Sequence, residues 1–358
     1  MKLTAKVKLL PTKEQAEMLL GTLKEANSAS DELSAYAFGQ QVFRQYDLHK
    51  AMYAHLRNNY NLSAQITVRC ISKVADAYKL DKETQRTFRP HGAIAYDSRI
   101  LTYKEESISI WTVGGRIKMP FVAGEHQKRM LVFQKGESDL AYVKGKFYLL
   151  ATCDIPDTEE EAFDDVLGID LGIVNIATTS DGETFSGKHI EQTRRRYHAI
   201  RSKLQSKGTK SAKRHLKKLS KRQQRFQTNT NHVISKKLVQ RAKGTNRSLA
   251  MEDLTHIRKR TEKRLRSTQR ARHSNWAFNQ LRLFVTYKAV GSGVVLHMVD
   301  PRNTSRTCYE CSHIAQENRR SQSEFKCVAC NHTTDADWNA ALNIRALVNV
   351  PIVASLSA

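Results

Sequence analysis

The chain has 358 residues, of which 40% are hydrophobic and 26% charged, and this composition suits a folded protein of two or three packed units. It contains no run of about 18 apolar residues, which excludes a membrane-spanning helix. Residues 1–10 also lack the apolar core and cleavage site of a signal peptide, so we expect a cytosolic protein. The net charge is +24, which favours a polyanionic partner.

The first 80 residues predict one strand followed by helices. Lys2–Leu10 alternates polar and apolar residues, as a strand does. Thr12 and Gln15 have the spacing of a capping box, and apolar residues then recur at helical intervals. We therefore expect a helix from residue 12 to about 38 and further helix to about residue 79.

A β-rich region follows Pro90 and predicts an antiparallel sheet or barrel. Hairpin turns are expected at Gly114-Gly115 and Lys144-Gly145. The strands are expected within Ala93–Tyr96, Ser107–Thr112, Met130–Phe133 and Lys146–Thr152. We expect the isolated first strand to pair with this sheet, which would make the helical segment an insertion. The acidic stretch Asp154–Asp165 resembles a linker.

The remaining chain alternates strands and helices. Strands are predicted at Val166–Ile173, Ile176–Thr179 and Thr184–Phe185, with a hairpin turn at Asp181-Gly182. After a basic helical stretch, the pattern predicts a strand at Ser248–Leu254, a helix at Asn275–Val290, a strand at Gly293–Val299 and a last helix from Asp335 to about Val348.

One segment carries the whole charge imbalance. Arg194–Arg272 contains 27 Lys or Arg against three acids, while the rest of the chain is balanced. A solvated helix face is one alternative, but such a face usually carries both positive and negative side chains. A membrane-binding surface is another, but membrane-binding helices also have an apolar side. Neutralisation by phosphates explains the concentration of charge better. The nucleic-acid-binding candidates are Arg194, Arg195, Arg196, Lys213, Arg214, Lys217, Lys218, Lys221, Arg222, Arg225, Lys236 and Lys237.

Four cysteines have the spacing of a zinc site: Cys308, Cys311, Cys327 and Cys330 form two C-x-x-C pairs separated by fifteen residues. Disulfides are the alternative, which a cytosolic location disfavours. Four thiolates leave no position for water, so the zinc would be structural. His332 is a less favoured substitute ligand. Asn331 suits a left-handed backbone and Ser312 suits it less well. Cys70 and Cys153 are expected to be ordinary buried cysteines.

Four carboxylates stand in predicted apolar strands or at the start of the last helix. Asp170 lies in the middle of an apolar strand and Glu252 at the end of another, and a buried acid is costly unless it is paired or bound to metal. Asp335 and Asp337 open the last helix. Each has an ordinary explanation, such as a helix cap. Together, a strand–hairpin–strand acid, a later strand acid and a helix acid follow the RNase H-like plan, in the Asp-Glu-Asp order of RuvC nucleases. Such a triad can hold two Mg²⁺ ions about 4 Å apart.

The glycines around Asp170 suit close approach of a ligand. They belong to the first of several sequence segments that occur in a specific order. The segments are Gly168-Ile169-Asp170-Leu171-Gly172, Arg225-Phe226, Asn231-His232-x-Ile234-Ser235-Lys236, Glu252-Asp253-Leu254, Trp276-x-Phe278-x-Gln280-Leu281, Asn303-Thr304-Ser305-x-x-Cys308-x-x-Cys311 and Asp337-x-Asn339-Ala340-Ala341-x-Asn343-Ile344. With these segments the chain resembles the TnpB family of transposon-associated RNA-guided DNA endonucleases, which are related to type V CRISPR effectors. Ser312, where glycine is usual, and the bulky Trp338 depart from the pattern.

The resemblance implies an α+β multidomain fold. Its parts would be a wedge-like antiparallel β-barrel (1–10 and 87–160) with a helical recognition insert (11–86). An RNase H-like, RuvC-type α/β nuclease domain (161–302 and 333–358) with a basic helical insert (about 190–246) would carry an inserted zinc ribbon (303–332). The Asp-x-Asn-Ala-Ala motif selects Asp337 over Asp335, so the implied catalytic and magnesium-binding triad is Asp170, Glu252 and Asp337.

The resemblance also implies the activity and the partners. The protein would use a guide RNA made from the transposon end, and would open and cut double-stranded DNA beside a short transposon-adjacent motif. Two Mg²⁺ ions and a structural Zn²⁺ would be its metals, and one protein chain would serve each RNA. Alternatives are a nuclease-silent RNA-guided DNA-binding regulator and a guide-independent structure-specific nuclease. The presence of all three acids disfavours the first, and the large basic segment disfavours the second. A strand transposase is disfavoured by the order of the acids.

Overall fold

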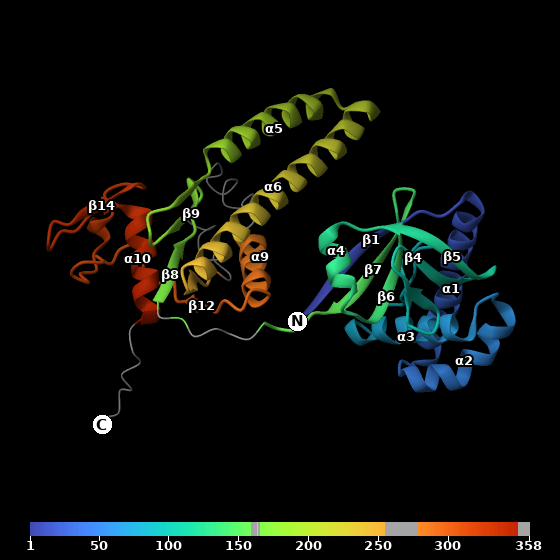
Figure 1. The fold of residues 1–358 in the computed structure, drawn as a ribbon. Helices are drawn as coiled ribbons and strands as arrows, with labels where there is room; N and C mark the ends of the chain where they lie inside the picture. Colours follow the sequence, from blue (N-terminus) through green and yellow to red (C-terminus); the bar gives the residue numbers. More distant parts are fainter. Residues whose placement is uncertain (159–162, 164, 255–277, 350–358) are drawn as a thin grey trace. The chain divides into compact units, whose positions relative to one another are not determined.

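The computed structural model describes residues 1–158, 163, 165–254 and 278–349 in two compact units, Met1–Pro156 and Asp157–Ala358 (Figure 1). Each unit has its own hydrophobic core. No described helix is long and apolar enough to cross a membrane. Trp276 of the predicted motifs, residues 275–277 of the predicted helix and the basic residues 258–272 lie outside the described residues.

The first unit is a curled antiparallel sheet with helices. Its strands follow the order β2-β6-β7-β1-β5-β4-β3. They are β1 (Lys2–Leu9), β2 (Ile94–Tyr96), β3 (Leu101–Tyr103), β4 (Ser107–Thr112), β5 (Gly115–Val122), β6 (Gln134–Val143) and β7 (Lys146–Asp154). The hydroxyl of Tyr103 in edge strand β3 donates to Ser138 Oγ in β6, 3.0 Å away. The sheet is therefore a nearly closed barrel, as expected.

The first strand pairs antiparallel with β5 and β7, which confirms the predicted pairing. Three helices stand between β1 and β2: α1 (Lys13–Gln40), α2 (Gln45–Asn59) and α3 (Ala64–Leu80). The capping box at Thr12 and Gln15 is present. Both predicted hairpin turns join paired strands, and Lys144, Gly145 and Gly115 have positive φ as tight turns require.

One predicted strand, Met130–Phe133, is wrong. Met130 lies in helix α4 (Glu125–Leu131), which Val132 and Phe133 follow as a turn. The helix has an acid, Glu125, in its first turn and two basic residues in its last turn, as the helix dipole favours. Met130 is buried against the sheet. The periodicity of four apolar residues alone cannot distinguish a short helix from a strand.

The second unit is built on a mixed five-stranded sheet of order β10-β9-β8-β11-β12. Neighbours β10, β9 and β8 are antiparallel, and β8, β11 and β12 are parallel. The strands are β8 (Asp165–Asp170), β9 (Asn175–Thr179), β10 (Thr184–Ser186), β11 (Arg247–Glu252) and β12 (Leu296–Val299). Asp165 is the first residue of β8, so it does not belong to the predicted linker. The predicted turn at Asp181-Gly182 is confirmed, since Gly182 N–H donates to Thr179 O.

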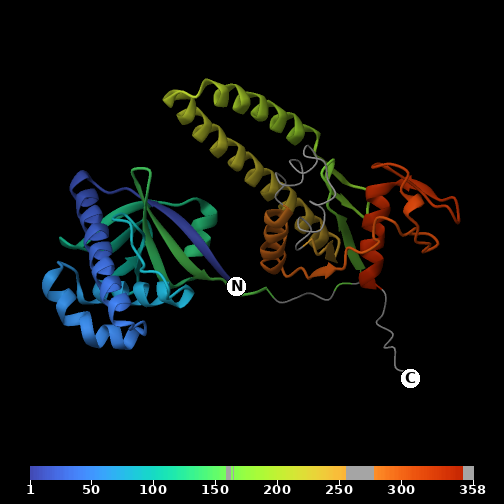
Figure 2. The same cartoon turned by 180° about the vertical axis from the view of Figure 1, so that it is seen from behind.

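Helices cover both faces of this sheet (Figures 1 and 2). On one face, residues of α6 (Lys210–Gly244) and α9 (Phe278–Val290) pack on alternate strand residues such as Leu167, Ile169 and Met251. On the other face, α10 (Ala336–Asn349) packs on Val166 and Ala250. Helix α5 (Lys188–Lys207) runs back along α6 as a long hairpin. A small module of η2 (Gln316–Asn318), β13 (Glu324–Lys326) and β14 (Thr333–Asp335) separates β12 from α10.

Gly168 is required by the packing of α10, a reason that the sequence did not indicate. A Cβ atom at Gly168 would lie 2.2 Å from the Ala341 carbonyl oxygen and 2.7 Å from the Arg345 nitrogen. Both are backbone atoms, so relief would require α10 to move. Gly172 serves the chain in the same way, because its added Cβ would lie 2.6 Å from the Asn175 carbonyl oxygen.

We expect Gly168→Ala to lower the free energy of unfolding by about 3 kcal/mol or more, because overpacked sites usually cost about 1–3 kcal/mol and this overlap is with backbone. Chemical denaturation of purified protein measures the change. Gly244→Ala is the matched control, since no atom lies within 4 Å of its added Cβ, and it should not destabilise the protein. Equal stability of the two variants would contradict the assigned packing of α10.

Candidate functional site

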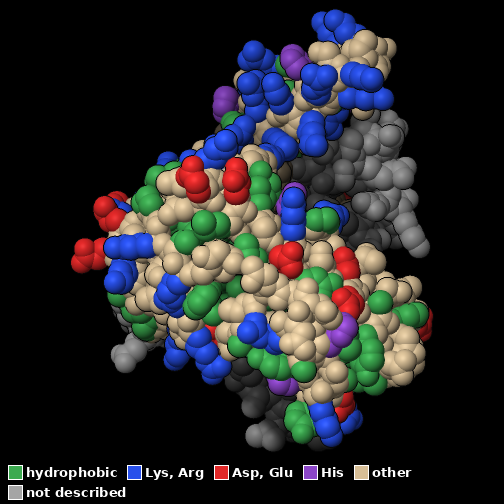
Figure 3. Space-filling view, turned by 90° about the vertical axis from the view of Figure 1, so that its right-hand side faces the viewer, with side chains coloured by type: hydrophobic (Ala, Val, Ile, Leu, Met, Phe, Trp, Pro, Cys, Tyr) green, Lys and Arg blue, Asp and Glu red, His purple; other side chains and the backbone are tan. Residues whose placement is uncertain are grey.

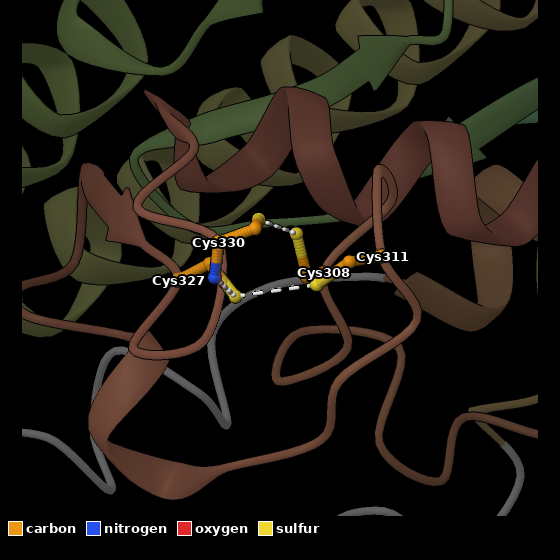
Figure 4. Close-up of side chains that lie close together, drawn as sticks. All are labelled: Cys308, Cys311, Cys327 and Cys330. Atoms are coloured by element: carbon orange, nitrogen blue, oxygen red, sulfur yellow. Dashed lines mark hydrogen bonds between the residues drawn. The ribbon is translucent and has the colours of Figure 1, made fainter.

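The four predicted cysteines converge in the small module between β12 and α10 (Figure 4). Their sulfur atoms all lie within 4.8 Å of one another, with Cys308 Sγ 3.7 Å from Cys330 Sγ and Cys311 Sγ 3.5 Å from Cys327 Sγ. Tetrahedral zinc with Zn–S bonds of about 2.3 Å places its sulfurs about 3.8 Å apart. The cluster therefore fits a metal ion such as zinc.

Two equivalent turns present these sulfurs. Ser312 N–H donates to Cys308 O, and Asn331 N–H donates to Cys327 O, at 2.8 and 3.1 Å. Both Ser312 and Asn331 have a left-handed backbone, with φ of 59° and 61°. The prediction for Asn331 is confirmed, and Ser312 takes the same conformation despite being less suited to it. His332 contributes its carbonyl, which accepts from Cys327 N–H, and is not in the converging ligand group.

The two remaining cysteines are buried in the first unit, as predicted. Burial raises the pKa of the Cys70 thiol to about 11, so the unreactive thiol form dominates near neutral pH. Cys153 belongs to the small cluster formed with Met130 and Ala151.

The sheet brings two predicted acids to one edge of the same face. Strands β8 and β11 are parallel neighbours, and they end at Asp170 and Glu252. Because side chains alternate along a strand, these acids share the face of Val166 and Ala250, against which α10 packs. Asp337 stands in the first turn of α10. All three predicted acids therefore lie near one another where α10 begins, close enough for the charges of Glu252 and Asp337 to act on Asp170. Among the described residues their oxygens do not form a group within 4.8 Å, as the four sulfurs do.

These carboxylates are in an environment that disfavours three negative charges. Burial raises the pKa of Asp170 well above its usual range, and the nearby charges of Glu252 and Asp337 raise it further. Burial also raises the pKa of Glu252 and of Asp337. Glu252 is buried, and Asp170 and Asp337 are half-buried. Neighbouring carboxylates are the oxygen ligands that divalent cations such as Mg²⁺ prefer, so the chemistry of this donor set fits Mg²⁺.

Asp335 has a structural role. Its Oδ1 accepts hydrogen bonds from the backbone N–H groups of Asp337 and Trp338, both at 3.0 Å, so it caps α10. Asp337 Oδ2 instead accepts from Asn175 Nδ2 at 2.9 Å, across the start of β9. This geometry favours Asp337 over Asp335 as the third acid.

Arg319 is a functional candidate that the sequence motifs did not indicate. The small module that holds the four cysteines (the cysteine module) places this cation beside the acids. Its Nη2 lies 3.6 Å from Asp337 Oδ1, and its positive charge opposes the raised pKa of Asp170, Glu252 and Asp337. In the sequence it is one of two adjacent arginines between the cysteine pairs. Nothing in the spacing distinguishes it from the exposed Arg320.

A chain of hydrogen bonds connects the same module to Glu252. The Thr304 hydroxyl donates to the Glu252 carboxylate, and the Thr304 carbonyl accepts from Asn343 Nδ2 of α10 at 2.9 Å. Asn339, also on α10, donates to Thr307 O and accepts from Tyr309 N–H. The conspicuous asparagines of the last motif thus fasten the first cysteine turn to α10.

All twelve predicted nucleic-acid-binding residues lie on the α5–α6 hairpin. Ten are exposed, whereas Arg194 and Lys221 are half-buried. Arg194 donates twice to Glu191 and Arg195 donates once, so these two arginines are partly neutralised. No α5 residue is buried. Lys and Arg side chains dominate the visible surface of the projecting hairpin (Figure 3), which therefore presents a positive surface.

Family models match both parts of the second unit. Residues 151–258 match a family described as "Probable transposase", and residues 278–344 match "Cas12f1-like, TNB domain". The second range includes Arg319, Asp337 and all four cysteines.

Curated relatives match about half of this chain. A Cas12f1 "CRISPR-associated endodeoxyribonuclease" of Sulfoacidibacillus thermotolerans is 32% identical over 56% of this chain and 50% of its own length. "TnpB-like protein MJ0751" of Methanocaldococcus jannaschii is 33% identical over 48% of this chain and 60% of its own. "Putative RNA-guided DNA endonuclease InsQ" of Escherichia coli is 27% identical over 51% and 48%. The aligned regions thus span about half to three fifths of these relatives.

Solved structures share the fold along most of the chain. A Cas12f1–sgRNA–target DNA complex matches with a TM-score of 0.64, 16% identity and coverage of 93% of this chain and 83% of that one. CasPhi-2 (Cas12j) bound to crRNA matches with a TM-score of 0.62, 10% identity and coverage of 97% and 98%. The fold is that of compact Cas12-type proteins. The family models, the relatives and the motifs together support the TnpB family for this chain.

Proposed function

We propose that this protein is a transposon-encoded, RNA-guided DNA endonuclease that cuts double-stranded DNA next to a short transposon-adjacent motif. The observation that carries the proposal is the placement of Asp170, Glu252 and Asp337 near one another, where the neighbouring strands β8 and β11 end and α10 begins. The names of three relatives, each an endonuclease or TnpB-like protein, support the same activity.

The proposed catalytic domain is RNase H-like, of the RuvC type. The sheet order β10-β9-β8-β11-β12, antiparallel on one side of β8 and parallel on the other, supports this assignment. We propose the domain boundaries predicted from sequence: a wedge-like barrel at 1–10 and 87–160, a helical insert at 11–86, the nuclease domain at 161–302 and 333–358, and the zinc ribbon at 303–332.

The acids would hold two Mg²⁺ ions, which supply an activated water and stabilise the leaving oxygen of a phosphodiester. The chain's own residues orient the acids. Thr304 donates to Glu252, and Asn175 donates to Asp337, so one oxygen of each carboxylate is fixed. Arg319 brings a positive charge to the same place, which suits a phosphate group of the DNA.

The proposed partners are a guide RNA derived from the transposon end and double-stranded target DNA, bound by one protein chain. The basic hairpin would contact phosphates, and base pairing by the guide would select the target. A nuclease-silent regulator is disfavoured because all three acids are present and lie near one another.

The proposed role of Arg319 gives a test with a matched control. Arg319→Ala should reduce DNA cutting by about 10²-fold, which is typical for removal of one preorganised electrostatic group, and should leave guide and target binding intact. Timed cleavage of a plasmid carrying the target measures the rate. Arg320→Ala, one residue along and exposed, should cut normally. Equal rates for both variants would remove Arg319 from the site.

A salt titration tests the role of the basic hairpin. Neutralising Lys213, Arg214, Lys217 and Lys218 should weaken nucleic-acid binding and flatten the dependence of log affinity on log salt concentration, because fewer counterions are released. Target choice should change little, since the guide reads the sequence. A solvated helix with no partner predicts identical slopes for wild type and variant, and that result would contradict the proposal.

A further inference from the structure

The junction of α6 and α9 carries an aromatic cluster that the carboxylate site does not use. The His232 ring stacks on Phe284, with centroids 3.9 Å apart and planes 13° apart. The Tyr287 ring meets Phe284 edge-on at 5.9 Å, and its hydroxyl oxygen lies 3.5 Å from His232 Nδ1. The two helices lie side by side in both ribbon views (Figures 1 and 2), so the cluster joins one helix to the other.

Lys288 places an ammonium group within this cluster. Its Nζ donates to His232 O at 2.7 Å and to Ser235 Oγ at 2.5 Å, and it lies 5.7 and 5.8 Å from the Phe284 and Tyr287 ring centroids. Among the described residues, its contacts are with uncharged groups. Burial lowers the pKa of Lys288 to about 8, and the nearby charge of Lys236 lowers it further. Lys236 and Lys288 therefore form a local excess of positive charge, and a bound anion would stabilise both charged groups.

The basic surface of the hairpin continues to this cluster along α6. Arg225, Asn229, His232 and Lys236 follow one another at intervals of four, three and four residues, which places them on one face of the helix. Arg225, Asn229 and Lys236 are exposed. A strand whose phosphates follow this face would therefore reach the rings at the α6–α9 junction.

Other residues of α9, outside the aromatic cluster, already pack this helix against α6. Leu281, Val285 and Ala289 are fully buried in the core shared with α6. Packing alone does not require two neighbouring ammonium groups, because like charges repel. Aromatic faces next to cations are instead the usual means of holding nucleotides of single strands.

We propose that the α6–α9 junction binds a single-stranded nucleic-acid segment, with a phosphate between Lys236 and Lys288 and a base against the His232 and Tyr287 rings. The inference rests on the proposed function only for the class of partner. Ribose and deoxyribose strands share this chemistry, and the experiment separates them.

Binding of the full-length protein to labelled oligo(dT) and oligo(U) of about 12 nucleotides, measured by fluorescence anisotropy, tests the inference. Lys236→Gln should weaken binding by about threefold to tenfold and reduce the salt slope by about 0.7, the value for one phosphate contact of a single strand. Lys50→Gln removes an equally exposed lysine in the first unit and is the matched control. Equal effects of the two substitutions would overturn the inference.

The base contact needs its own variants. His232→Ala combined with Tyr287→Ala should weaken binding by about fivefold or more, the effect of losing one stacked base. Tyr287→Phe should retain most of the affinity. Thermal unfolding should accompany each variant, because His232 and Lys288 also join the two helices; Lys236 is exposed and keeps the test valid if the double variant unfolds.

Photo-crosslinking identifies the strand. Oligonucleotides carrying 4-thiothymidine or 4-thiouridine should label peptides from α6 or α9, and the stronger label shows whether DNA or RNA occupies the junction. Labels confined to other segments would overturn the inference. If the wild-type protein binds both strands and cuts DNA, and Lys236→Gln leaves oligonucleotide binding unchanged, only the proposed site at the α6–α9 junction is rejected. Wild-type protein that binds neither strand rejects the proposed function as well.

Discussion

Asp337→Asn should abolish DNA cutting, with a loss of about 10³-fold or more, while guide and target binding persist. The substitution keeps the size of the side chain and removes the charge that a divalent cation needs. Because Asp337 lies on α10 and the substitution changes no residue of the basic hairpin, binding should be unaffected. Timed plasmid cleavage in Mg²⁺ measures the first quantity, and a gel shift with guide and target measures the second.

Asp335→Asn is the control, since Asp335 lies two residues away but caps α10. Asn is also a good cap, so this variant should cut at close to the normal rate. If Asp335→Asn is inactive and Asp337→Asn cuts, the third acid has been assigned to the wrong residue.

Without bound metal, the mutual repulsion of these acids should lower the stability of the protein. In metal-free buffer, Asp170→Asn should raise the unfolding temperature, because it removes a buried charge that Glu252 and Asp337 repel. A fall in unfolding temperature for Asp170→Asn without metal would contradict the mutual repulsion of the three acids.

Glu252→Gln should also abolish cutting.

Loss of the metal at the cysteine cluster should have the second large effect. Cys308→Ser should eliminate tightly bound zinc and lower the free energy of unfolding of the second unit by several kcal/mol, because binding energy at a four-thiolate site is folding energy. Elemental analysis of protein purified without chelators should find about one zinc per wild-type chain. Absence of zinc from the wild type would contradict the assignment.

Cys153→Ala is the matched control, because Cys153 is buried in the first unit and outside the cluster. It should retain one zinc even if it is somewhat less stable. Any loss of zinc from this variant would show that the measured metal is not held by the four predicted cysteines.

The cysteine module should also affect cutting through Thr304. Cys308→Ser should impair cutting, since the loop containing Thr304 is fastened to the first cysteine turn and to α10. Thr304→Val separates the two effects, because it removes the hydrogen bond to Glu252 and leaves all four cysteines. It should keep its zinc and cut more slowly. Normal cutting by Thr304→Val would show that Glu252 does not need this orientation.

The most predictable parts of the molecule were those fixed by local chemistry. The two C-x-x-C pairs predicted a convergent thiol cluster because two residues between thiols place both on one turn. The capping box and the hairpin turns were likewise recognisable, since each depends on a few adjacent residues. Asp170 and Glu252 could be proposed as site residues because a charged residue within or at the end of an apolar strand is costly unless it is paired or bound to metal.

The missed features depend on contacts between distant residues. Arg319 meets Asp337 only because the cysteine module folds back toward α10, which the local sequence does not encode. The packing role of Gly168 was missed because the close approach of Ala341, more than 170 residues away, cannot be recognised in the local sequence. The strand predicted at Met130–Phe133 was wrong because four apolar residues do not distinguish a strand from the end of a short helix and the turn that follows it.

The position of β1 in the first unit has a consequence for folding kinetics. This strand lies inside the sheet, between β5 and β7, with Lys2 opposite Asp154 and Leu9 opposite Phe121. The sheet therefore needs contacts between residues that are more than 100 positions apart in the chain. Such topologies fold slowly, because loop-closure entropy is lost before the pairing stabilises the product. Helices α1–α3 should form early from local contacts, and the barrel should close only when β7 joins β1.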